Sequence, residues 1–448
     1  MTIGKMIIKD DVNFLLNAYD GTGGFADGSY LTQFPRETDT AFKERKTRAH
    51  YKNFVRKLVN IYVGFLTQRD PTRQTDDLYS QFALNADGAG HHLDTVLVNF
   101  IRLTLITGTT YIIVDKPQGI AATMAEEKLP YLSIRLRNQL INYKKNFVGQ
   151  FEECTFSENY DAGYTQTGLR YRKFTKTTWE ILDENMGVIE SGEHNLGRVP
   201  VITFHIAQPL KPCDHFSRTF INDVADLALK LYRLDSNQME VSNDTSFPLF
   251  TLPASSQEER ESLRNGSVVI GTKNALVYDP TNGGKPSYVS PEAVTFEQNS
   301  KLIAETVEAI YTVANFEFFG SVHPSGEALS WHFMGANMSL GTIAEMCEQM
   351  ETSIAQLVYL WFNREFTGSI SYNKEFNLAA IKDSIGNALD AMTLNIGQTF
   401  DNALKKKTAR EVLGNTTSIE VMTEIDKEID AGGDVYANRI QQAAGLTP

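Results

Sequence analysis

PEAVTFEQNSKLIAETVEAIYTV at residues 291–313 and ANFEFFGSVHPSG at residues 314–326 are the two segments that decide the fold. In the first, Ile303, Val307 and Ile310 recur three and four residues apart, which is the spacing of one apolar face of a helix. The second segment lacks this spacing and contains two glycines, so it predicts a loop that ends the helix.

A long helix is predicted directly after this loop, over residues 327–363. Cys347 lies within its apolar stripe, so we interpret this cysteine as a small core residue. The stripe alternates three and four apart over three heptads, which is typical of packing against another long helix: Leu340, Ile343, Cys347, Met350, Ile354, Leu357 and Trp361.

Upstream of residue 291 the sequence predicts a further helix and a small β block. Residues 217–242 form the helix, with apolar positions at Ile221, Val224, Leu227, Leu231 and Leu234. Residues 247–289 form the β block, with strand-like runs at 268–270 and 275–278 and a turn at Asn282-Gly283-Gly284. The predicted order is therefore helix, β block, helix, loop and long helix.

The first half of the chain predicts strands with helices packed beside them. A helix over 93–106 is ended by Gly108, and the strand Tyr111–Val114 stops at Asp115-Lys116-Pro117. Further strand-like runs lie at 131–136, 147–156, 169–174, 178–182 and 199–205. Beyond the long helix, residues 378–404 and a capping box at Thr417 and Glu420 predict two more helices. The fold class is α+β.

Residues 38–67 also have a helical pattern, with one apolar and one basic face. The basic face admits three interpretations: a solvated surface, pairing with acids on a neighbouring subunit, or contact with DNA. Its members are Lys43, Arg45, Lys46, Arg48, Lys52, Arg56 and Lys57.

Composition excludes several classes of protein. The net charge of −13 over 448 residues argues against a protein that grips duplex DNA, because phosphate binding requires an excess of lysine and arginine. The sequence contains no run of about 18 apolar residues, so no membrane span is predicted. The three cysteines, Cys154, Cys213 and Cys347, are far apart, which favours a reducing compartment over a disulfide framework.

No catalytic constellation stands out. His91-His92-x-Asp94 is better explained as the start of a helix than as a metal site, and Asp115 as a turn residue than as a catalytic carboxylate. Cys154 has no histidine nearby in sequence. We therefore predict no catalytic residue, no metal, no cofactor and no enzymatic activity.

Four short sequence words, in this order, make the chain resemble the portal proteins of tailed bacteriophages. They are Tyr30-Leu31-x-x-Phe34-Pro35-Arg36-Glu37 before the basic helix, the strand segment from Gly108 to Pro117, Gly197-Arg198-Val199-Pro200-Val201, and Pro324-Ser325-Gly326-Glu327-Ala328-Leu329. The resemblance covers about residues 30 to 365 and agrees with the predicted order of elements.

This resemblance implies a portal-protein fold with an α/β wing, a helical stem, a small β-rich clip, a long helix and a helical C-terminal crown. By position, the wing is 1–216, the stem helices are 217–246 and 291–313, and the clip is 247–290. The tunnel loop is then 314–326, the long wing helix 327–376 and the crown 377–448.

The resemblance further implies a homo-oligomeric ring, a dodecamer, at the portal vertex of the capsid in the virion, assembled from chains made in the host cytoplasm. DNA would pass through the ring during packaging and ejection. The implied partners are double-stranded DNA, the terminase large subunit, head–tail adaptor proteins, and the major capsid and scaffold proteins.

The candidate site residues follow from these assignments. For the clip, the docking candidates are Val268, Ile270, Lys273 and Tyr278. For the DNA channel, the candidates are Phe316, Glu317, Phe318, Phe319, Gly320 and His323 in the tunnel loop and Lys301 in the stem. Glu317 would repel phosphate and a charged His323 would attract it. The phenylalanines equally suit an anchor for the loop, and Lys301 a solvated or paired lysine.

Two alternatives stay open. One is another structural virion protein, such as an adaptor or a capsid component. The other is a metal-dependent hydrolase or nuclease, which would require carboxylates and histidines to converge in space.

Overall fold

A computed structural model describes residues 3–35, 37–117, 128–161, 167–207, 216–246, 249–253, 275–278, 287–289, 293–315, 326–374, 397–413 and 419–430, with the single residues 209, 256, 258, 261, 285 and 376. Helices and strands are both well represented, so the predicted α+β class is confirmed. Of the helices within these ranges, none is long and apolar enough to cross a bilayer.

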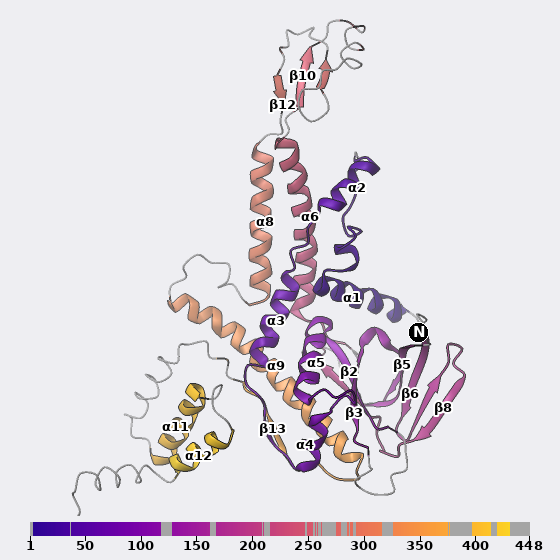
Figure 1. Ribbon diagram of the computed structural model, residues 1–448, viewed down its shortest axis with the longest axis vertical. Helices are drawn as coiled ribbons and strands as arrows, with labels where there is room; N and C mark the ends of the chain where they lie inside the picture. The colour runs from indigo at the N-terminus through magenta and orange to yellow at the C-terminus, as the bar shows by residue number, and fades with distance from the viewer. Residues whose placement is uncertain are drawn as a thin grey trace, which may run out of the picture.

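Two long antiparallel helices project from the body of the molecule (Figure 1). They are α6 (Phe220–Ser246) and α8 (Ala293–Val313), which pack against each other along their length and which we call the stalk. The sequence predicted both, at 217–242 and 291–313.

A three-stranded sheet lies at the far end of the stalk, where the sequence predicted a β block. The central strand β10 (Leu249–Pro253) pairs parallel with β11 (Ala275–Tyr278) and antiparallel with β12 (Ser287–Val289). The predicted strand at 268–270 and the turn at 282–284 lie outside the described residues.

In the body, β2 (Thr109–Asp115) is the centre of a sheet with β3 (Tyr131–Leu136) and β9 (Val201–His205). Helix α5 (Leu93–Thr107) precedes β2, as predicted, and ends at Gly108 with φ 84°. A Cβ at this position would lie 2.0 Å from the carbonyl oxygen of Ser217, so the close approach of two chain segments also requires glycine.

A second, five-stranded sheet in the body is antiparallel and follows chain order. Its strands are β4 (Leu140–Lys145), β5 (Phe151–Asp161), β6 (Thr167–Thr175), β7 (Thr178–Leu182) and β8 (Val188–Glu193). The edge strands β4 and β8 were not predicted, because their side chains are mostly exposed or half-buried and lack an apolar alternation.

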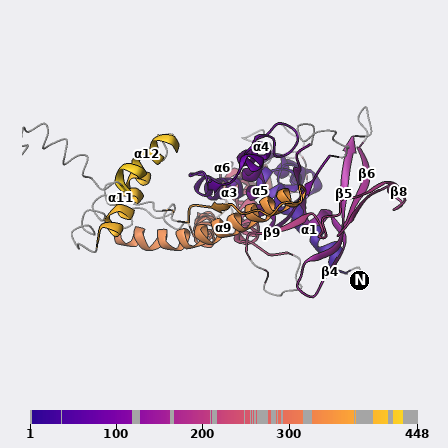
Figure 2. The same ribbon diagram turned by 90° about the horizontal axis from the view of Figure 1, so that it is seen from below.

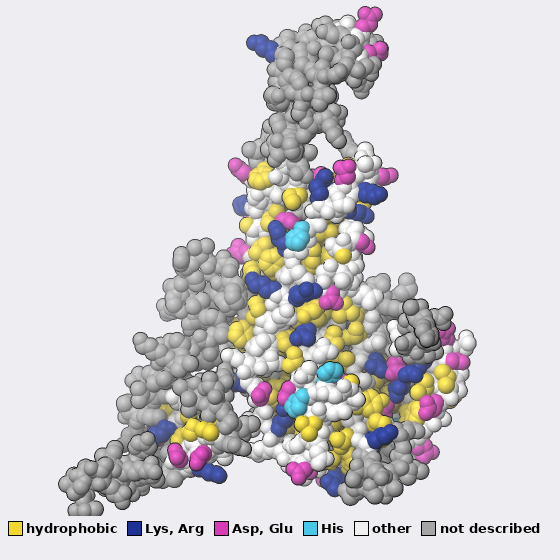
Figure 3. Space-filling view, in the orientation of Figure 1, with side chains coloured by type: hydrophobic (Ala, Val, Ile, Leu, Met, Phe, Trp, Pro, Cys, Tyr) yellow, Lys and Arg dark blue, Asp and Glu magenta, His cyan; other side chains and the backbone are white. Residues whose placement is uncertain are grey.

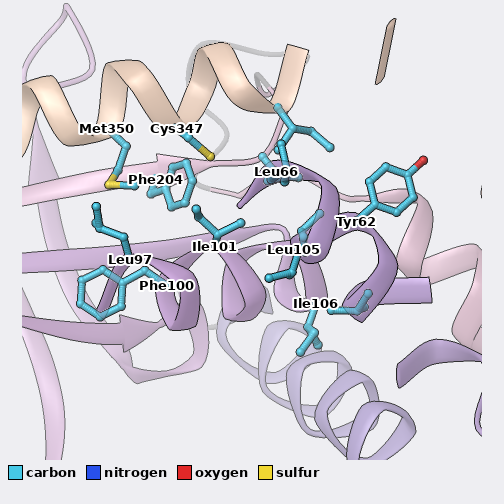
Figure 4. Close-up of a cluster of buried hydrophobic side chains, with 14 of the residues drawn as sticks. Tyr62, Leu66, Leu97, Phe100, Ile101, Leu105, Ile106, Phe204, Cys347 and Met350 are labelled. Carbon is cyan, nitrogen blue, oxygen red and sulfur yellow. The ribbon is translucent and has the colours of Figure 1, made fainter. Parts of the chain in front are cut away.

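Helix α9 (Gly326–Leu360) crosses the base of the stalk (Figures 1 and 2). Its predicted apolar stripe is buried, except that Trp361 is half-buried, and Cys347 lies in the core as expected. The predicted long-helix partner is wrong, because α9 packs on the shorter α3 (Phe54–Leu66) and on strands β2, β9 and β13 (Ser369–Ser371). Figure 4 shows Cys347 and Met350 of α9 above Phe204 of β9 and Ile101 of α5.

The continuous helix predicted over 38–67 is also wrong. The chain forms α2 (Asp39–Arg48), breaks, and begins α3 at Phe54 with Asn53 as N-cap, whose Oδ1 accepts the N–H of Arg56 at 2.8 Å. The side-chain oxygen of an asparagine can accept a backbone N–H that has no partner in the first turn of a helix. Asn53 therefore favours a new helix start here, and the break has a local cause.

The remaining elements complete the body and the C-terminal part. They are α1 (Ile3–Asp20), η1 (Gly23–Phe25), β1 (Thr72–Gln74), α4 (Asp77–Leu84), η2 (Arg137–Gln139), α11 (Gln398–Leu413) and α12 (Ile419–Asp430). The predicted helix at 378–404 overlaps α11 only from Gln398, since 377–396 lie outside the described residues. Glu420 of the predicted capping box lies in α12, and Thr417 is outside the description.

Candidate functional site

Among the described side chains of the stalk, those that belong to the main core lie in the half that joins the body. Ile221, Val224 and Leu231 of α6 and Ile310 of α8 belong to the main core. Further out, the described side chains of α8 from 296 to 305 are all half-buried or exposed. The described side chains of the outer half of this helix pair therefore form no apolar core of their own.

Large apolar side chains are nevertheless present on that outer half. Met239 of α6 is 49% exposed, and Phe296 and Leu302 of α8 are 39% and 42% exposed. Figure 3 shows apolar patches along the stalk, between charged side chains. Gln238 of α6 joins the two helices here, because its Nε2 donates to Ser300 Oγ at 3.0 Å and to the Phe296 carbonyl at 3.5 Å.

Lys301, the predicted phosphate contact, lies on the exposed surface of α8. Its Nζ is 3.9 Å from Oε1 of Glu305, one helical turn away. Glu297 and Glu308 are exposed on the same helix. In the single chain the lysine is thus exposed and weakly paired, on a helix whose exposed charge is mainly negative.

The base of α8 is fixed to α3. Lys57 Nζ lies 3.0 Å from the hydroxyl of Tyr311, and the Tyr62 hydroxyl donates to the carbonyl of Ala314 at 2.9 Å. Burial raises the pKa of Tyr62 to about 12, so this hydroxyl stays protonated and remains a donor at physiological pH. The point at which the chain leaves α8 is therefore held firmly in the body.

Helix α2 and the loop before it form an arm that lies along α6, to the right of the stalk in Figure 1. Arg45 is buried in this arm, with its Nε 2.8 Å from Glu37 Oε1, one terminal nitrogen 2.7 Å from the Thr32 carbonyl, and the other 3.3 Å from Ser236 Oγ of α6. The hydrogen bond from Arg45 lowers the pKa of Glu37.

Further cations of the predicted basic face pair with acids of the same chain. Arg48 forms a forked contact with Glu240, at 2.7 and 2.9 Å, and Lys52 Nζ lies 2.6 Å from Asp235. Pairing with acids was anticipated, but its location on a neighbouring subunit is wrong for Arg45, Arg48 and Lys52. The signal missed was the acidic row Asp235 and Glu240, which faces the arm.

Under the stalk, a buried carboxylate connects α9 to three other segments. Glu351 has no exposed surface and accepts hydrogen bonds from Arg73 Nε (2.6 Å), the Tyr372 hydroxyl (2.6 Å) and the Tyr79 hydroxyl (3.1 Å). Burial first, and the Glu351 charge next, raise the pKa of Tyr79 and Tyr372 well above the ordinary value. Both tyrosines therefore act as donors, and the network is a structural joint.

An open pocket of about 870 Å³ lies between the two body sheets, beside the end of α9. Its lining combines aromatic and acidic side chains with two cations: Asp115, Lys116, Pro117, Tyr131, Arg172, Trp179, Ile181, Glu190, Gly192, Glu193 and Trp361. No single segment of sequence could have indicated it, because its residues come from six separate segments of the chain.

The arginines beside this pocket neutralise two carboxylates. Asp115 Oδ2 accepts from Arg172 at 2.9 Å and from the Tyr131 hydroxyl at 3.1 Å, so this residue is part of an ion-pair network as well as the end of its strand. Burial alone would raise the pKa of Glu158, but Arg172 and Arg135 outweigh it and hold that pKa below its usual value.

Most of the predicted site residues lie outside the described part of the chain. This holds for Phe316, Glu317, Phe318, Phe319, Gly320 and His323 of the predicted tunnel loop and for Val268, Ile270 and Lys273 of the predicted clip. Tyr278 is at the end of β11, opposite Pro253 of β10.

The residues weighed for catalysis have structural positions. His92 is the N-cap of α5, so the predicted helix start is confirmed, and His91 Nδ1 lies 2.6 Å from Asp87. Cys154 is buried, which raises the pKa of its thiol. Within the described residues, no three histidine, cysteine, aspartate or glutamate side chains are arranged to hold a metal ion.

Comparison with known proteins gives distant structural likenesses. The chain matches no family model and no curated protein. It is similar to a chain in the neck of an empty gene transfer agent (GTA) particle computed with C6 symmetry, with a TM-score of 0.43 and 11% identity over 76% of this chain and 86% of that one.

Two further structures are similar at the same level. A chain in the virion of a native gene transfer agent particle has a TM-score of 0.40 and 12% identity, over 90% of this chain and 99% of that one. A chain in the neck of the native particle computed with C12 symmetry has the same score and identity, over 84% and 94%. At this distance the likeness does not say what the present chain does.

Proposed function

We propose that this chain is a phage portal protein, the subunit of a ring at one capsid vertex through which DNA is packaged and ejected. The observation that carries the proposal is the stalk, whose outer half combines exposed Met239, Phe296 and Leu302 with the lack of a core among its described side chains.

Such a stalk is expected to need neighbours. A two-helix hairpin without a buried face gains little from packing, and most helical stability in proteins comes from tertiary contacts. Each large apolar side chain that becomes fully buried contributes roughly 1.5–3 kcal/mol. Side-by-side stalks in a closed ring would bury these residues in every copy, because a cyclic arrangement repeats the same contact.

The parts of the chain are assigned within that ring as follows. Residues 1–216 and 327–376 are the wing, α6 and α8 the stem, and 247–290, which include β10 to β12, the clip. Residues 314–326 are the tunnel loop and 377–448 the crown. In support, residues 314–326 connect the fixed base of α8 to the start of α9, where a loop would leave the body.

The charge on α8 suits a channel that does not hold DNA. Glu297, Glu305 and Glu308 outnumber Lys301 on its exposed surface, and Glu305 lies beside that lysine. Duplex DNA binds tightly where several cations displace its counterions. If this surface faces the lumen, phosphate is repelled along most of α8 and the duplex slides.

The proposed partners follow from position. Terminase large subunit would dock on the β10–β12 end of the stalk during packaging, and head–tail adaptor proteins would replace it afterwards. Major capsid and scaffold proteins would surround the wing.

Electron microscopy of the purified chain in negative stain tests the proposal. We expect rings with a central hole, and a particle mass near twelve chains by light scattering. A compact monomer at all concentrations, or closed shells without a hole, would overturn the portal assignment, the latter in favour of a capsid component. A divalent-metal nuclease assay on the same sample tests the enzymatic alternative, and we expect no cleavage.

A further inference from the structure

The turn between β4 and β5 presents apolar side chains to solvent. Phe147, at its tip, is fully exposed, and Val148 is 66% exposed. Scattered exposed apolar residues are common on proteins. Here, however, two are adjacent on a projecting turn, where polar residues are the rule.

The backbone of this turn is held by three hydrogen bonds that one residue, Asn146, accepts. Asn146 Oδ1 accepts the backbone N–H of Val148 at 3.0 Å and of Gln150 at 2.9 Å, and its carbonyl accepts the N–H of Gly149 at 3.0 Å. Gly149 has φ 89°, which completes the tight turn. Phe147 and Val148 are therefore displayed by a preorganised backbone, which lowers the entropic cost of binding.

Lysines surround the turn. Lys144 and Lys176 both approach Glu152, at 3.0 and 3.5 Å, so two cations share one carboxylate. Lys144 is largely exposed. The turn is thus an apolar tip with a basic border.

The open pocket beside α9 has acids on one side, and its two cations have partners of their own, Arg172 at Asp115 and Lys116 over the Phe362 ring. Trp179, Ile181 and Trp361 provide apolar lining, while Glu190 and Glu193 are exposed acids at its β8 side. Asp115 is already neutralised by Arg172. Among the described residues, Glu190 and Glu193 form no ion pair, and Glu193 accepts one long hydrogen bond from Asn195 Nδ2 at 3.4 Å.

We propose that the Asn146–Gln150 turn of one copy inserts into the pocket of a second copy. In this contact the apolar side chains Phe147 and Val148 pack against the aromatic lining of the pocket. The lysines beside the turn pair with Glu190 and Glu193. The turn joins β4 to β5, whereas Trp179, Glu190 and Glu193 of the pocket lie on β7 and β8 of the same sheet, at least two strand spacings or roughly 10 Å away at about 4.8 Å per strand. Because the turn is also fixed by its hydrogen bonds to Asn146, a chain does not fill its own pocket.

Such a contact is heterologous, with different surfaces on the two copies, and contacts of this kind generate rings when the rotation closes. The inference adds a wing contact to the proposed ring and in that respect rests on the proposed function.

Disulfide trapping tests the contact. Val148→Cys and Glu190→Cys are placed on separate, differently tagged full-length chains, co-expressed, in a Cys213→Ser background in which Cys154 and Cys347 are buried. Mild oxidation is expected to give a dimer that carries both tags. The matched control replaces Glu190→Cys by Glu184→Cys, in the β7–β8 turn outside the pocket, and should not crosslink.

Side-chain variants provide a second measurement. Phe147→Ser with Val148→Ser should lower the crosslinking rate of the Lys144→Cys and Glu190→Cys pair about tenfold, as expected for loss of a central apolar anchor. Glu190→Lys with Glu193→Lys should lower the crosslinking of Val148→Cys with Gly192→Cys similarly. Because these sites are exposed, the melting temperature should stay unchanged, and Val188→Ser on β8 serves as the control.

The outcomes separate the two proposals. Rings in the microscope without the mixed crosslink overturn the turn-in-pocket contact and leave the portal assignment intact. A chain that is monomeric at all concentrations and does not crosslink overturns both. A mixed crosslink that Glu184→Cys matches in yield also counts against the contact.

Discussion

Arg73 Nε lies 2.6 Å from Oε1 of Glu351, a carboxylate without exposed surface, although 278 positions separate the two residues. The same arginine reaches Asp94 at 2.6 Å, so one guanidinium connects α9 with α5. The pair is the polar centre of the region beneath the stalk.

Glu351→Gln should destabilise the fold by about 3 kcal/mol, because it leaves the Arg73 charge only partly compensated in a buried site. Urea unfolding monitored by circular dichroism measures the change. Glu345→Gln, at an exposed position on the same helix, is the matched control and should change stability by less than about 0.5 kcal/mol. Equal effects of the two substitutions would show that the network contributes little.

Acid should weaken the five-stranded sheet through Glu158. Its folded pKa lies below the ordinary value of 4.5, so the unfolded chain takes up a proton first as the pH falls. The stabilisation is present above pH 4.5 and is lost on acidification through the lower, folded pKa. Unfolding free energies measured from pH 7 to pH 3 should fall more steeply for the wild type than for Glu158→Gln.

His205 predicts a separate pH effect at milder acidity. Burial, and secondarily the charge of Lys145, lower its pKa from 6.5 to about 4. Between pH 6.5 and 4 this histidine is therefore protonated in the unfolded chain but neutral in the folded chain. Acidification over this range should lower the free energy of unfolding by at most about 3 kcal/mol. His205→Gln should flatten the loss over this pH range. An unchanged slope would contradict the assignment.

Arg45→Met should release the arm without unfolding the body. The substitution leaves Glu37 without its buried partner and removes the contact with Ser236. Hydrogen exchange is expected to accelerate at least about tenfold for residues 37–48, the factor that corresponds to about 1.4 kcal/mol, while the amides of β2 keep their protection. Lys43→Met, at an exposed site in the same helix, is the control.

Met239→Ser combined with Leu302→Ser tests the stalk. The two side chains are half exposed in the single chain, so the unfolding free energy of an isolated chain should change by less than about 0.5 kcal/mol for each. Ring formation, measured by sedimentation velocity, should need at least about tenfold higher protein concentration. Thr312→Ser, exposed on α8, is the control.

Helices and strands were predicted well where their buried side chains recur at regular spacing in the sequence. Strand β2 contains the apolar run Tyr111–Val114 and α5 ends at a glycine that the backbone requires, so both were predicted to within two residues at each end. The stripe on α9 was also found, yet its partner was not, because an apolar stripe packs equally well on Phe204 of a sheet as on a second long helix.

The candidate sites were harder to predict, because they depend on pairs distant in sequence. In the sequence, Arg48 cannot be distinguished from other surface cations, because its partner Glu240 lies 192 positions away. The same is true of the pocket, where Asp115, Trp179 and Trp361 meet only after three elements have packed. Edge strand β8 has no alternation of apolar and polar residues, because most of its side chains are exposed on both faces.

The junction at Gly108 limits how the stalk can move. Beside the close contact of Gly108 with Ser217, the Ser217 N–H donates to Thr109 Oγ1 at 2.8 Å, its hydroxyl donates to the Gly108 carbonyl at 2.8 Å, and Thr219 Oγ1 donates to the Leu105 carbonyl at 3.1 Å. The segment that leads into α6 is therefore fixed to the end of α5 and to the start of β2. A tilt of the whole stalk would therefore move the central sheet as well, so the stalk can bend on its own only beyond Ser236, the last buried residue of α6 among its described side chains.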